Sequence, residues 1–361
     1  MSRSTDGEGY VLPKPGITPY KGDDIVAYTS NNPPPFEYVR HLGAGRFGEV
    51  TIVRGKKNRQ LYACKTFKTG GKQADDLRQD LQDEFRKVRR MTASRYVVQA
   101  VSAYAIPHKG TFHLILEPVA IGGDLESFLK RYRDASSSPL VSPHTEHGNF
   151  KETTNTDRWD ELNINPLQTL FNSFGGLAAG LYSLHRQNMR HRDIKPANCL
   201  IHKGRVLLSD FGFARLYEGA EKYAMESSGD PGIKNYRYRA PEVVRQLHRG
   251  KETDVFSLGC TFVEIFASLL GDQSRVDPWP EEPKGTQARR VKIVYYSKVI
   301  DAVSEALLAP VNPRTKYAPG VLKLAKIIGR MLVDDPAKRI KAEELTGQQL
   351  HELGDLQTWW A

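Results

Sequence analysis

HRDIKPAN at residues 191–198, and DFG, which begins at Asp210, are the two most informative stretches of this chain. Asp193 can act as a base that orients a hydroxyl group. Asn198 and Asp210 carry hard oxygen atoms of the kind that bind Mg²⁺, and Lys195 adds positive charge nearby. Such a group of side chains suits phosphoryl transfer, in which a protein mainly positions the reactants and neutralises charge.

Three glycines, Gly43, Gly45 and Gly48, lie in the stretch LGAGRFGEV at residues 42–50. The GxGxxG spacing alone is weakly specific, because dinucleotide-binding folds share it. A dinucleotide site needs a helix directly after the glycines, whereas Glu49–Val53 continues as a strand. We therefore expect a β-hairpin whose glycines let the backbone close over phosphate groups. No GxxxxGK[ST] motif occurs, which excludes a P-loop NTPase.

Lys65 lies in the strand-like run LYACKTF, and Glu84 follows in DEFRKV, where the charge spacing predicts a helix. A single strand lysine is usually a surface residue. Paired with Glu84, however, its ammonium would be aimed at the α- and β-phosphates of a nucleotide. At about 4 Å and an effective dielectric constant near 20, such a pair attracts by about 4 kcal/mol before desolvation costs.

The chain changes character along its length. Residues 1–35, rich in Gly, Pro and Asp, predict a flexible N-terminal tail. Residues 36–118 predict a small antiparallel β lobe, with one key helix at 75–91 and strands at 36–42, 49–54, 61–67, 97–104 and 112–117. Residues 119–361 predict a larger, mainly α lobe, with helices at 124–133, 167–187, 252–270, 297–308, 321–332 and 341–350. Residues 134–165, which are poor in apolar side chains, are expected to form a mobile surface insertion.

The composition is that of an ordinary soluble globular protein, with 39% hydrophobic and 26% charged residues. Lys and Arg outnumber Asp and Glu by 52 to 42, but the basic residues form short scattered clusters without a nucleic-acid-binding motif. No apolar run reaches the ~18 residues of a membrane span, and the three cysteines lack metal-site spacing. We expect a cytoplasmic or nuclear protein without a nucleic-acid partner. The oligomeric state stays open.

The ordered series of motifs resembles the eukaryotic protein kinases over roughly residues 36–350. The likeness extends to Ala-Pro-Glu at 240–242, to the run DVFSLG at 254–259, and to Asp-Pro-Ala-Lys-Arg at 335–339. It implies a bilobal α+β fold with ATP and Mg²⁺ as cofactors, and it implies that Arg339 pairs with Glu242.

The resemblance also implies a role for each residue of the site. The expected catalytic residues are Asp193, Lys195, Lys65 and Glu84, and the expected metal ligands are Asn198 and Asp210. The residues expected to bind ATP are Leu42, Gly43, Ala44, Gly45, Arg46, Phe47, Gly48, Val50, Ala63, Lys65, Glu117, Val119, Asp124 and Leu200. Among these, the Glu117 carbonyl and the Val119 N–H would hold adenine, with the gatekeeper Leu116 directly before them in the chain. Asp124 would contact the ribose, and the adenine ring would lie between Val50, Ala63 and Leu200.

Lys195, two residues after Asp193, is the residue typical of serine/threonine kinases, so the expected partner is a protein substrate with a Ser or Thr acceptor. One departure concerns Asn235, which stands where the family usually has Thr. A pseudokinase that binds ATP or partners as a scaffold is therefore a second hypothesis. A small-molecule kinase fits poorly, because Ala-Pro-Glu and the helix after Asp254 are features for docking a protein.

The segment between DFG and Ala-Pro-Glu suggests regulation. We hypothesise that an upstream kinase phosphorylates Ser227 or Ser228 and that Arg192 and Arg215 hold the phosphate; a merely polar loop is the alternative. Ala197, which follows Lys-Pro, gives no support for a substrate with upstream arginines. The basic residues Arg237 and Arg239 could instead suit an acidic or phosphorylated neighbour of the acceptor.

Overall fold

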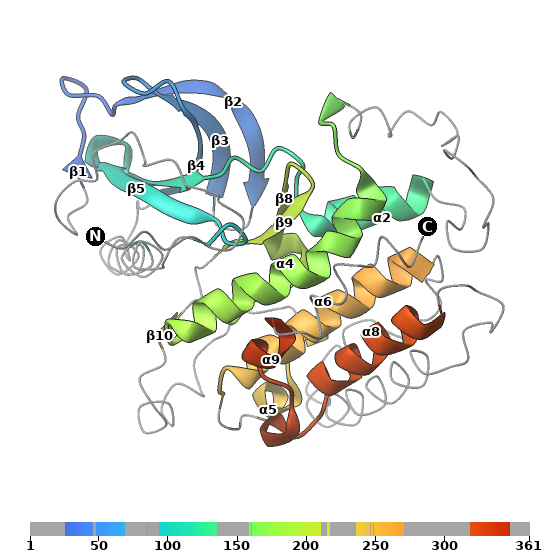
Figure 1. The fold of residues 1–361 in the computed structure, drawn as a ribbon. Helices are drawn as coiled ribbons and strands as arrows, with labels where there is room; N and C mark the ends of the chain where they lie inside the picture. Colours follow the sequence, from blue (N-terminus) through green and yellow to red (C-terminus); the bar gives the residue numbers. More distant parts are fainter. Residues whose placement is uncertain are drawn as a thin grey trace, which may run out of the picture. The chain divides into compact units, whose positions relative to one another are not determined.

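The structure is a computed structural model. It describes residues 26–45, 48–68, 85, 94–135, 159, 161–210, 215–216, 236–245, 247, 249–270 and 318–346. The chain divides into two compact units (Figure 1): a sheet unit, Met1–Arg89 with Gln99–Val119, and a helical unit, Arg90–Val98 with Ala120–Ala361. The division after Val119 lies one residue from the predicted lobe boundary. Residues 90–98, which were predicted in the first lobe, belong to the helical unit.

The sheet unit contains six strands in the order β1-β5-β6-β4-β3-β2. Their bounds are β1 (Val26–Ala27), β2 (Phe36–Gly45), β3 (Gly48–Gly55), β4 (Leu61–Lys68), β5 (Gln99–Ile106) and β6 (Thr111–Glu117), with a 3₁₀ turn η1 (Pro107–Lys109) between the last two. The five predicted strands are confirmed, and they pair antiparallel as expected.

The additional strand β1 corrects the N-terminal prediction. Val26 and Ala27 pair parallel with Tyr104 and Ala105 of β5, so the sheet is mixed rather than purely antiparallel. Tyr28 is only 6% exposed, and its ring meets that of Tyr104 edge-on. The prediction of a flexible tail through residue 35 is therefore wrong for residues 26–28, because a contact with a distant strand outweighs the local composition. Residues 1–25 lie outside the described residues.

His113 of β6 provides a pH test of the sheet unit. Its ring stacks on Tyr104, and its nitrogens lie 3.1 Å from Thr66 Oγ1 and 2.9 Å from Thr111 Oγ1. Burial, together with the nearby Lys109, lowers the pKa of His113 from 6.5 to about 4. Between these values the unfolded chain binds a proton that the folded chain does not, so stability falls as the pH decreases through this window.

We expect this effect to cost about 2 kcal/mol between pH 7 and pH 5. In urea denaturation at the two pH values, His113→Gln should lose correspondingly less stability on acidification than the wild type. The exposed His108 supplies the control, and His108→Gln should behave as the wild type does. An equal pH response in wild type and His113→Gln would show that His113 does not cause the loss.

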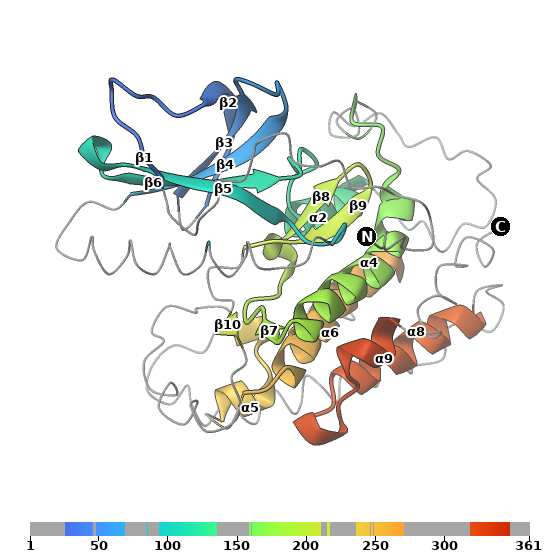
Figure 2. The ribbon, with the colours of Figure 1, turned by 60° about the vertical axis from the view of Figure 1, so that its left-hand side comes forward.

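The helical unit is built around two long neighbouring helices, α4 (Pro166–Arg186) and α6 (Glu252–Leu270), as Figure 2 shows. The other helices are α2 (Leu125–Ala135), α5 (Pro241–Val244), α8 (Ala318–Met331) and α9 (Ala342–Thr346), with 3₁₀ turns η2 (Pro196–Asn198), η5 (Tyr236–Tyr238) and η7 (Pro336–Lys338). Two small antiparallel ribbons complete it: β7 (Met189–Arg190) with β10 (Arg215–Leu216), and β8 (Cys199–His202) with β9 (Arg205–Leu208).

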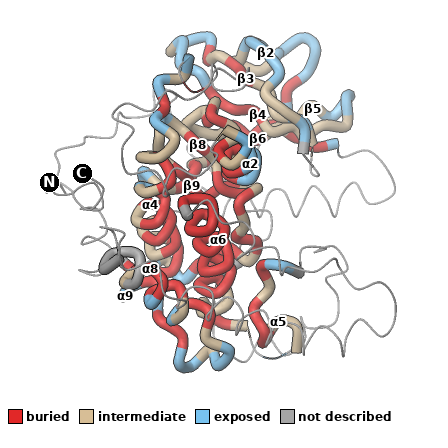
Figure 3. Tube along the Cα trace, turned by 90° about the vertical axis from the view of Figure 1, so that its right-hand side faces the viewer, coloured by how far each residue is buried: buried red, intermediate tan, exposed pale blue. Residues whose placement is uncertain are grey.

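Burial follows the two central helices, which Figure 3 shows as largely buried along their length. The first of them, α4, begins where Asn165 Oδ1 accepts a hydrogen bond from the Gln168 N–H at 2.9 Å, with Pro166 in the first turn. The predicted helices at 124–133, 167–187, 252–270 and 321–332 are confirmed within a few residues. The helix predicted at 297–308 lies outside the described residues, as does the part of 341–350 beyond Thr346. None of the described helices is long and apolar enough to cross a membrane.

Residues 94–98 pack closely against α4, and this approach is possible because α4 carries glycines, Gly176 and Gly180, at the points of contact. A Cβ on Gly180 would lie 2.9 Å from the Tyr96 carbonyl oxygen, and one on Gly176 would lie 3.0 Å from the Tyr96 ring. Tyr96 O also accepts the Leu208 N–H of β9 at 2.9 Å. These contacts fix the segment against α4 and β9.

Trp159 corrects part of the predicted mobile insertion at 134–165. Residues 136–158 and 160 lie outside the described residues, but Trp159 is buried, and its ring lies 5.3 Å from that of Phe128 on α2. Ile164 is buried as well. The end of the segment therefore packs against the helical unit, because its two large apolar side chains reach the core.

Candidate active site

Asp254, in the first turn of α6, shapes the loop that carries Asp193. Its carboxylate accepts hydrogen bonds from the His191 and Arg192 N–H groups, each at 2.8 Å, and lies 3.0 Å from His185 Nε2. Burial alone would raise the pKa of Asp254, but the hydrogen bond with His185, the electrostatic influence of the His185 and His191 rings and the Arg192 N–H keep this pKa below its ordinary value. The ionised carboxylate holds Arg192 in a left-handed backbone conformation, φ 71°, immediately before Asp193.

Asp193 is held by two donors that reach the same oxygen. Lys195 Nζ lies 2.7 Å from Asp193 Oδ2, and Asn198 Nδ2 donates to Oδ2 at 2.8 Å and to the Asp193 carbonyl at 2.7 Å. Among the described residues no hydrogen bond reaches Oδ1. The side chain is only 8% exposed, so the loop presents one oriented carboxylate oxygen with a lysine ammonium beside it.

The two predicted metal ligands fit Mg²⁺ by their chemistry. Because the Asn198 amide nitrogen donates to Asp193, its Oδ1 lies on the other side of the amide group. The Asn198 carbonyl accepts both the Ser209 N–H and the Ser209 hydroxyl at 2.9 Å, which places Asp210 next in the chain with a left-handed φ of 63°. In the described part of the chain no three His, Cys, Asp or Glu side chains gather as a metal site. Two hard oxygen ligands suffice for Mg²⁺ when phosphates and waters complete its shell.

Asp124 and Leu200, expected at the ribose and the adenine, are brought together by a β-bridge. Two hydrogen bonds flank it, from the Gly122 N–H to Ile201 O at 3.1 Å and from the Ile201 N–H to Gly123 O at 2.8 Å. A Cβ on Gly122 would meet the Ile201 side chain at 2.7 Å, so this approach requires glycine. The Asp124 carboxylate also caps α2.

The sheet unit gathers the other ATP-binding residues on one face. Val50 pairs with Lys65, and Ala63 pairs with Leu116, so the pleat turns these four side chains to the same side. The opposite face carries the packed core, formed by Tyr28, Val53, Tyr62, Cys64, Tyr104 and Ile115. Lys65 therefore lies among the predicted adenine-lining residues.

The glycine-rich stretch forms the predicted hairpin, in which Gly45 pairs with Gly48 and Gly43 pairs with Val50. Gly48 has a φ of 142°, and a Cβ there would lie 1.9 Å from the Thr66 carbonyl oxygen, so only glycine fits. Leu42 and Ala44 lie in the same hairpin. A strand follows the glycines, as predicted.

Glu117, expected to offer its carbonyl to adenine, ends β6, and Val119 follows two residues later. Gln60 Nε2 donates to Glu117 Oε2 at 3.0 Å, which links the end of β6 to the residue before β4. Burial raises the pKa of this carboxyl group, although the Gln60 hydrogen bond opposes the shift.

Several predicted residues lie outside the described part of the chain. They are Glu84, Arg46, Phe47, Asn235, Ser227 and Ser228, so their predicted roles stay predictions.

The predicted pair between Glu242 and Arg339 is confirmed. Arg339 Nη1 and Nη2 donate to the two Glu242 carboxylate oxygens at 2.7 and 3.0 Å, and both side chains are buried. Thr253 Oγ1 donates to the same carboxylate at 3.2 Å. The pair joins α5, which contains Glu242, to the segment after α8, which contains Arg339.

Sequence reasoning missed a second group of polar residues. His185 and Asp254 clamp the catalytic loop, Tyr238 donates its hydroxyl to Glu264 at 2.6 Å, and Arg190 donates to the Arg249 carbonyl. No spacing in the sequence connects these pairs. Because each pair joins segments far apart in the chain, the sequence alone does not indicate which residues will pair.

Comparison with known proteins agrees with this geometry. A profile described as the protein kinase domain matches residues 36–350. The chain is 25% identical over 315 residues to an Aurora kinase of Yarrowia lipolytica, covering 86% of this chain and 66% of that protein. It is 38% identical over 185 residues to cyclin-dependent kinase 4 of Xenopus laevis, covering 50% of this chain and 55% of that protein. It is 32% identical over 175 residues to the serine/threonine-protein kinase chk1 of Schizosaccharomyces pombe, covering 48% of this chain and 30% of that protein.

The chain therefore belongs to the protein kinase family, and it is of the eukaryotic serine/threonine type. It spans less than two thirds of the length of these relatives.

Proposed function

We propose that this chain transfers the γ-phosphoryl group of ATP to serine or threonine hydroxyl groups of protein substrates. The observation that carries the proposal is the Asp193 carboxylate, held through Oδ2 by Lys195 and Asn198. A buried carboxylate fixed in this way can accept a hydrogen bond from a substrate hydroxyl through Oδ1, and so orient the hydroxyl oxygen for attack on phosphorus.

The neighbouring residues neutralise charge. The Lys195 ammonium, 2.7 Å from Asp193, lies where the phosphoryl group would pass and would stabilise its developing negative charge. Asn198 Oδ1 and the Asp210 carboxylate would hold Mg²⁺, which when bound offsets the charge of the transferred phosphates. Lys65, on the face of the sheet that carries Val50 and Ala63, would hold the α- and β-phosphates.

A phosphotransfer assay tests this function. The purified chain is incubated with γ-labelled ATP, Mg²⁺ and a generic protein substrate, and the labelled amino acids are identified after hydrolysis. We expect label on serine or threonine. If the chain binds nucleotide but transfers no label, even after treatment with candidate activating kinases, it acts as a nucleotide-binding scaffold instead.

The placement of Lys65 gives a further prediction. Lys65→Met should lower kcat/KM by about 10²- to 10³-fold, because it removes one preorganised positive group from the phosphates. Lys68→Met is the matched control: Lys68 lies on the same strand, three residues further on, and is exposed. Because successive strand residues alternate, its side chain belongs to the opposite face. Equal losses in the two variants would contradict the predicted role of Lys65.

A further inference from the structure

The segment 249–251, which leads into α6, is joined to the end of α4 by the side chain of Lys251. Its ammonium donates to the His185 carbonyl oxygen at 2.6 Å and to Asn188 Oδ1 at 2.8 Å. Arg190 in turn donates to the carbonyl of Arg249 in the same segment. The chain that leads from α4 to the catalytic loop is therefore fastened to this segment at three points.

The Lys251 ammonium suits the end of a helix. The last residue of α4 is Arg186, and Asn188 follows with a left-handed φ of 53°, so that its N–H donates to the same His185 carbonyl at 3.1 Å. Carbonyl groups at a helix C-terminus carry partial negative charge, which a lysine ammonium stabilises. Because Lys251 is partly buried, water screens these charge-assisted hydrogen bonds less than it would on an open surface. They fix the point at which α4 ends.

His185 is held from two sides by the beginning of α6. Its backbone carbonyl accepts from Lys251, and its ring Nε2 lies 3.0 Å from Oδ2 of Asp254. The Asp254 N–H donates to the Lys251 carbonyl at 3.1 Å, so the two residues that hold His185 belong to one hydrogen-bonded turn. As long as Lys251 holds the backbone of His185, the ring stays within reach of the Asp254 carboxylate.

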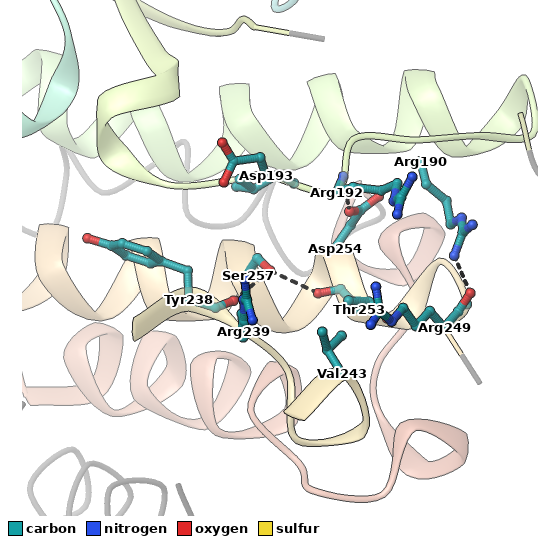
Figure 4. Close-up of a pocket in the computed structure, with 12 residues that line it drawn as sticks. Arg190, Arg192, Asp193, Tyr238, Arg239, Val243, Arg249, Thr253, Asp254 and Ser257 are labelled. Atoms are coloured by element: carbon teal, nitrogen blue, oxygen red, sulfur yellow. Dashed lines mark hydrogen bonds between the residues drawn. The ribbon is translucent and has the colours of Figure 1, made fainter. Parts of the chain in front are cut away.

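The catalytic loop is held at Asp254 by hydrogen bonds, beside a space that side chains do not fill. The Asp254 carboxylate accepts the N–H groups of His191 and Arg192, each at 2.8 Å. Figure 4 shows this carboxylate beside Arg192, one residue before Asp193. The loop and the first turn of α6 both line a pocket of about 70 Å³. Close packing therefore contributes less here, and the hydrogen bonds to one carboxylate set the position of the loop.

We propose that Lys251 is a positioning residue for phosphoryl transfer: it holds the end of α4, keeps the His185 ring against Asp254, and through that carboxylate places Asp193. This proposal rests on the proposed kinase function. The contacts that carry it lie at the end of α4 and the beginning of α6, and not among the residues expected to bind ATP. Loss of the ammonium should therefore lower kcat and leave the KM for ATP close to its wild-type value.

Steady-state kinetics of the full chain give the first test. Lys251→Met keeps most of the length of the side chain but removes the ammonium, and it should lower kcat by about 10- to 100-fold, the effect of a displaced catalytic group. Lys251→Arg should restore most of the wild-type kcat, because a guanidinium group also donates in several directions. Lys326 is exposed on α8 in the same unit, and Lys326→Met should match the wild type.

Amide hydrogen exchange gives a second test that does not depend on phosphate transfer. In Lys251→Met, exchange should accelerate in residues 186–194, which contain the two amide groups that Asp254 holds. Residues 199–208, which form the ribbon of β8 and β9, should exchange as in the wild type. A variant that is merely less stable would exchange faster in both segments.

A double variant tests the route through the His185 ring. His185→Phe keeps a ring of similar shape but removes the nitrogen that lies against Asp254. If Lys251 acts through this ring, Lys251→Met should lower kcat little further when His185→Phe is already present. Losses of kcat that multiply in the double variant would show that the route is wrong.

The outcomes separate this proposal from the function beneath it. A wild-type chain that transfers no phosphate overturns the proposed function. Unchanged exchange of residues 186–194 in Lys251→Met overturns the positioning role, whether or not the wild type is active. With an active wild type, the role is also overturned if Lys251→Met retains its kcat, if Lys251→Arg restores none of the loss, or if exchange accelerates equally in both segments.

Discussion

Asp193→Asn is expected to lower kcat of phosphoryl transfer by about 10²- to 10⁴-fold, the contribution typical of a positioned general base. Asparagine retains one side-chain oxygen, which can still accept from Lys195 and Asn198 at the place of Oδ2. The amide NH₂ group then occupies the place of Oδ1 and donates where a carboxylate oxygen would accept. The loop should keep its conformation while the substrate hydroxyl loses its acceptor.

Steady-state kinetics and thermal unfolding of the same preparation measure the two parts of this expectation. The KM for ATP and the melting temperature should remain close to the wild-type values. Glu126→Gln removes a carboxylate from the exposed face of α2 in the same unit and is the control. If Asp193→Asn retained more than about a tenth of the wild-type kcat, Asp193 could not be the base.

Arg339→Met is expected to lower the free energy of unfolding by about 3–5 kcal/mol, because it leaves the Glu242 carboxylate buried without its cation. The exposed fractions of the two side chains are 0% and 2%, so water cannot replace the guanidinium. Arg339 also donates to the carbonyl groups of Val333 and Glu252, and these would lose a donor as well. Urea denaturation measures the loss.

A surface pair in the same region supplies the matched control. Arg245 donates to both carboxylate oxygens of Asp334 at 2.7 and 2.9 Å, but the side chains are 31% and 48% exposed. Arg245→Met should therefore cost no more than about 1 kcal/mol. In the double variant with Glu242→Gln and Arg339→Met, part of the stability lost in Arg339→Met should return, because no buried charge remains. If Arg339→Met and Arg245→Met lowered the free energy of unfolding equally, burial of the Glu242–Arg339 pair could not explain the expected loss.

Much of the fold could be predicted because local patterns carried it. Short β-branched or aromatic runs marked the five antiparallel strands. That Lys65, Ala63 and Val50 share one face follows from the strand register of the structure. The strand-like run Glu49–Val53 directly after the glycines distinguished a hairpin from a strand–turn–helix unit. The resemblance then supplied the pairing of Glu242 with Arg339, which spacing alone could not predict.

The family of the chain and its division into a sheet unit and a helical unit could be predicted from the sequence, since both depend on residues close together in the chain. The catalytic roles of the residues at 191–198 stay predictions. Long-range packing buries Tyr28, brings Asp254 to the backbone of the loop that carries Asp193, and gathers Arg190, Arg192, Arg239 and Arg249 around one pocket. Asp254 lies 63 residues from His191, and Arg190 lies 59 residues from the Arg249 carbonyl that it binds. Periodicity reports which side of an element a residue occupies, but not which distant element covers that side, because packing of the whole chain selects the partner.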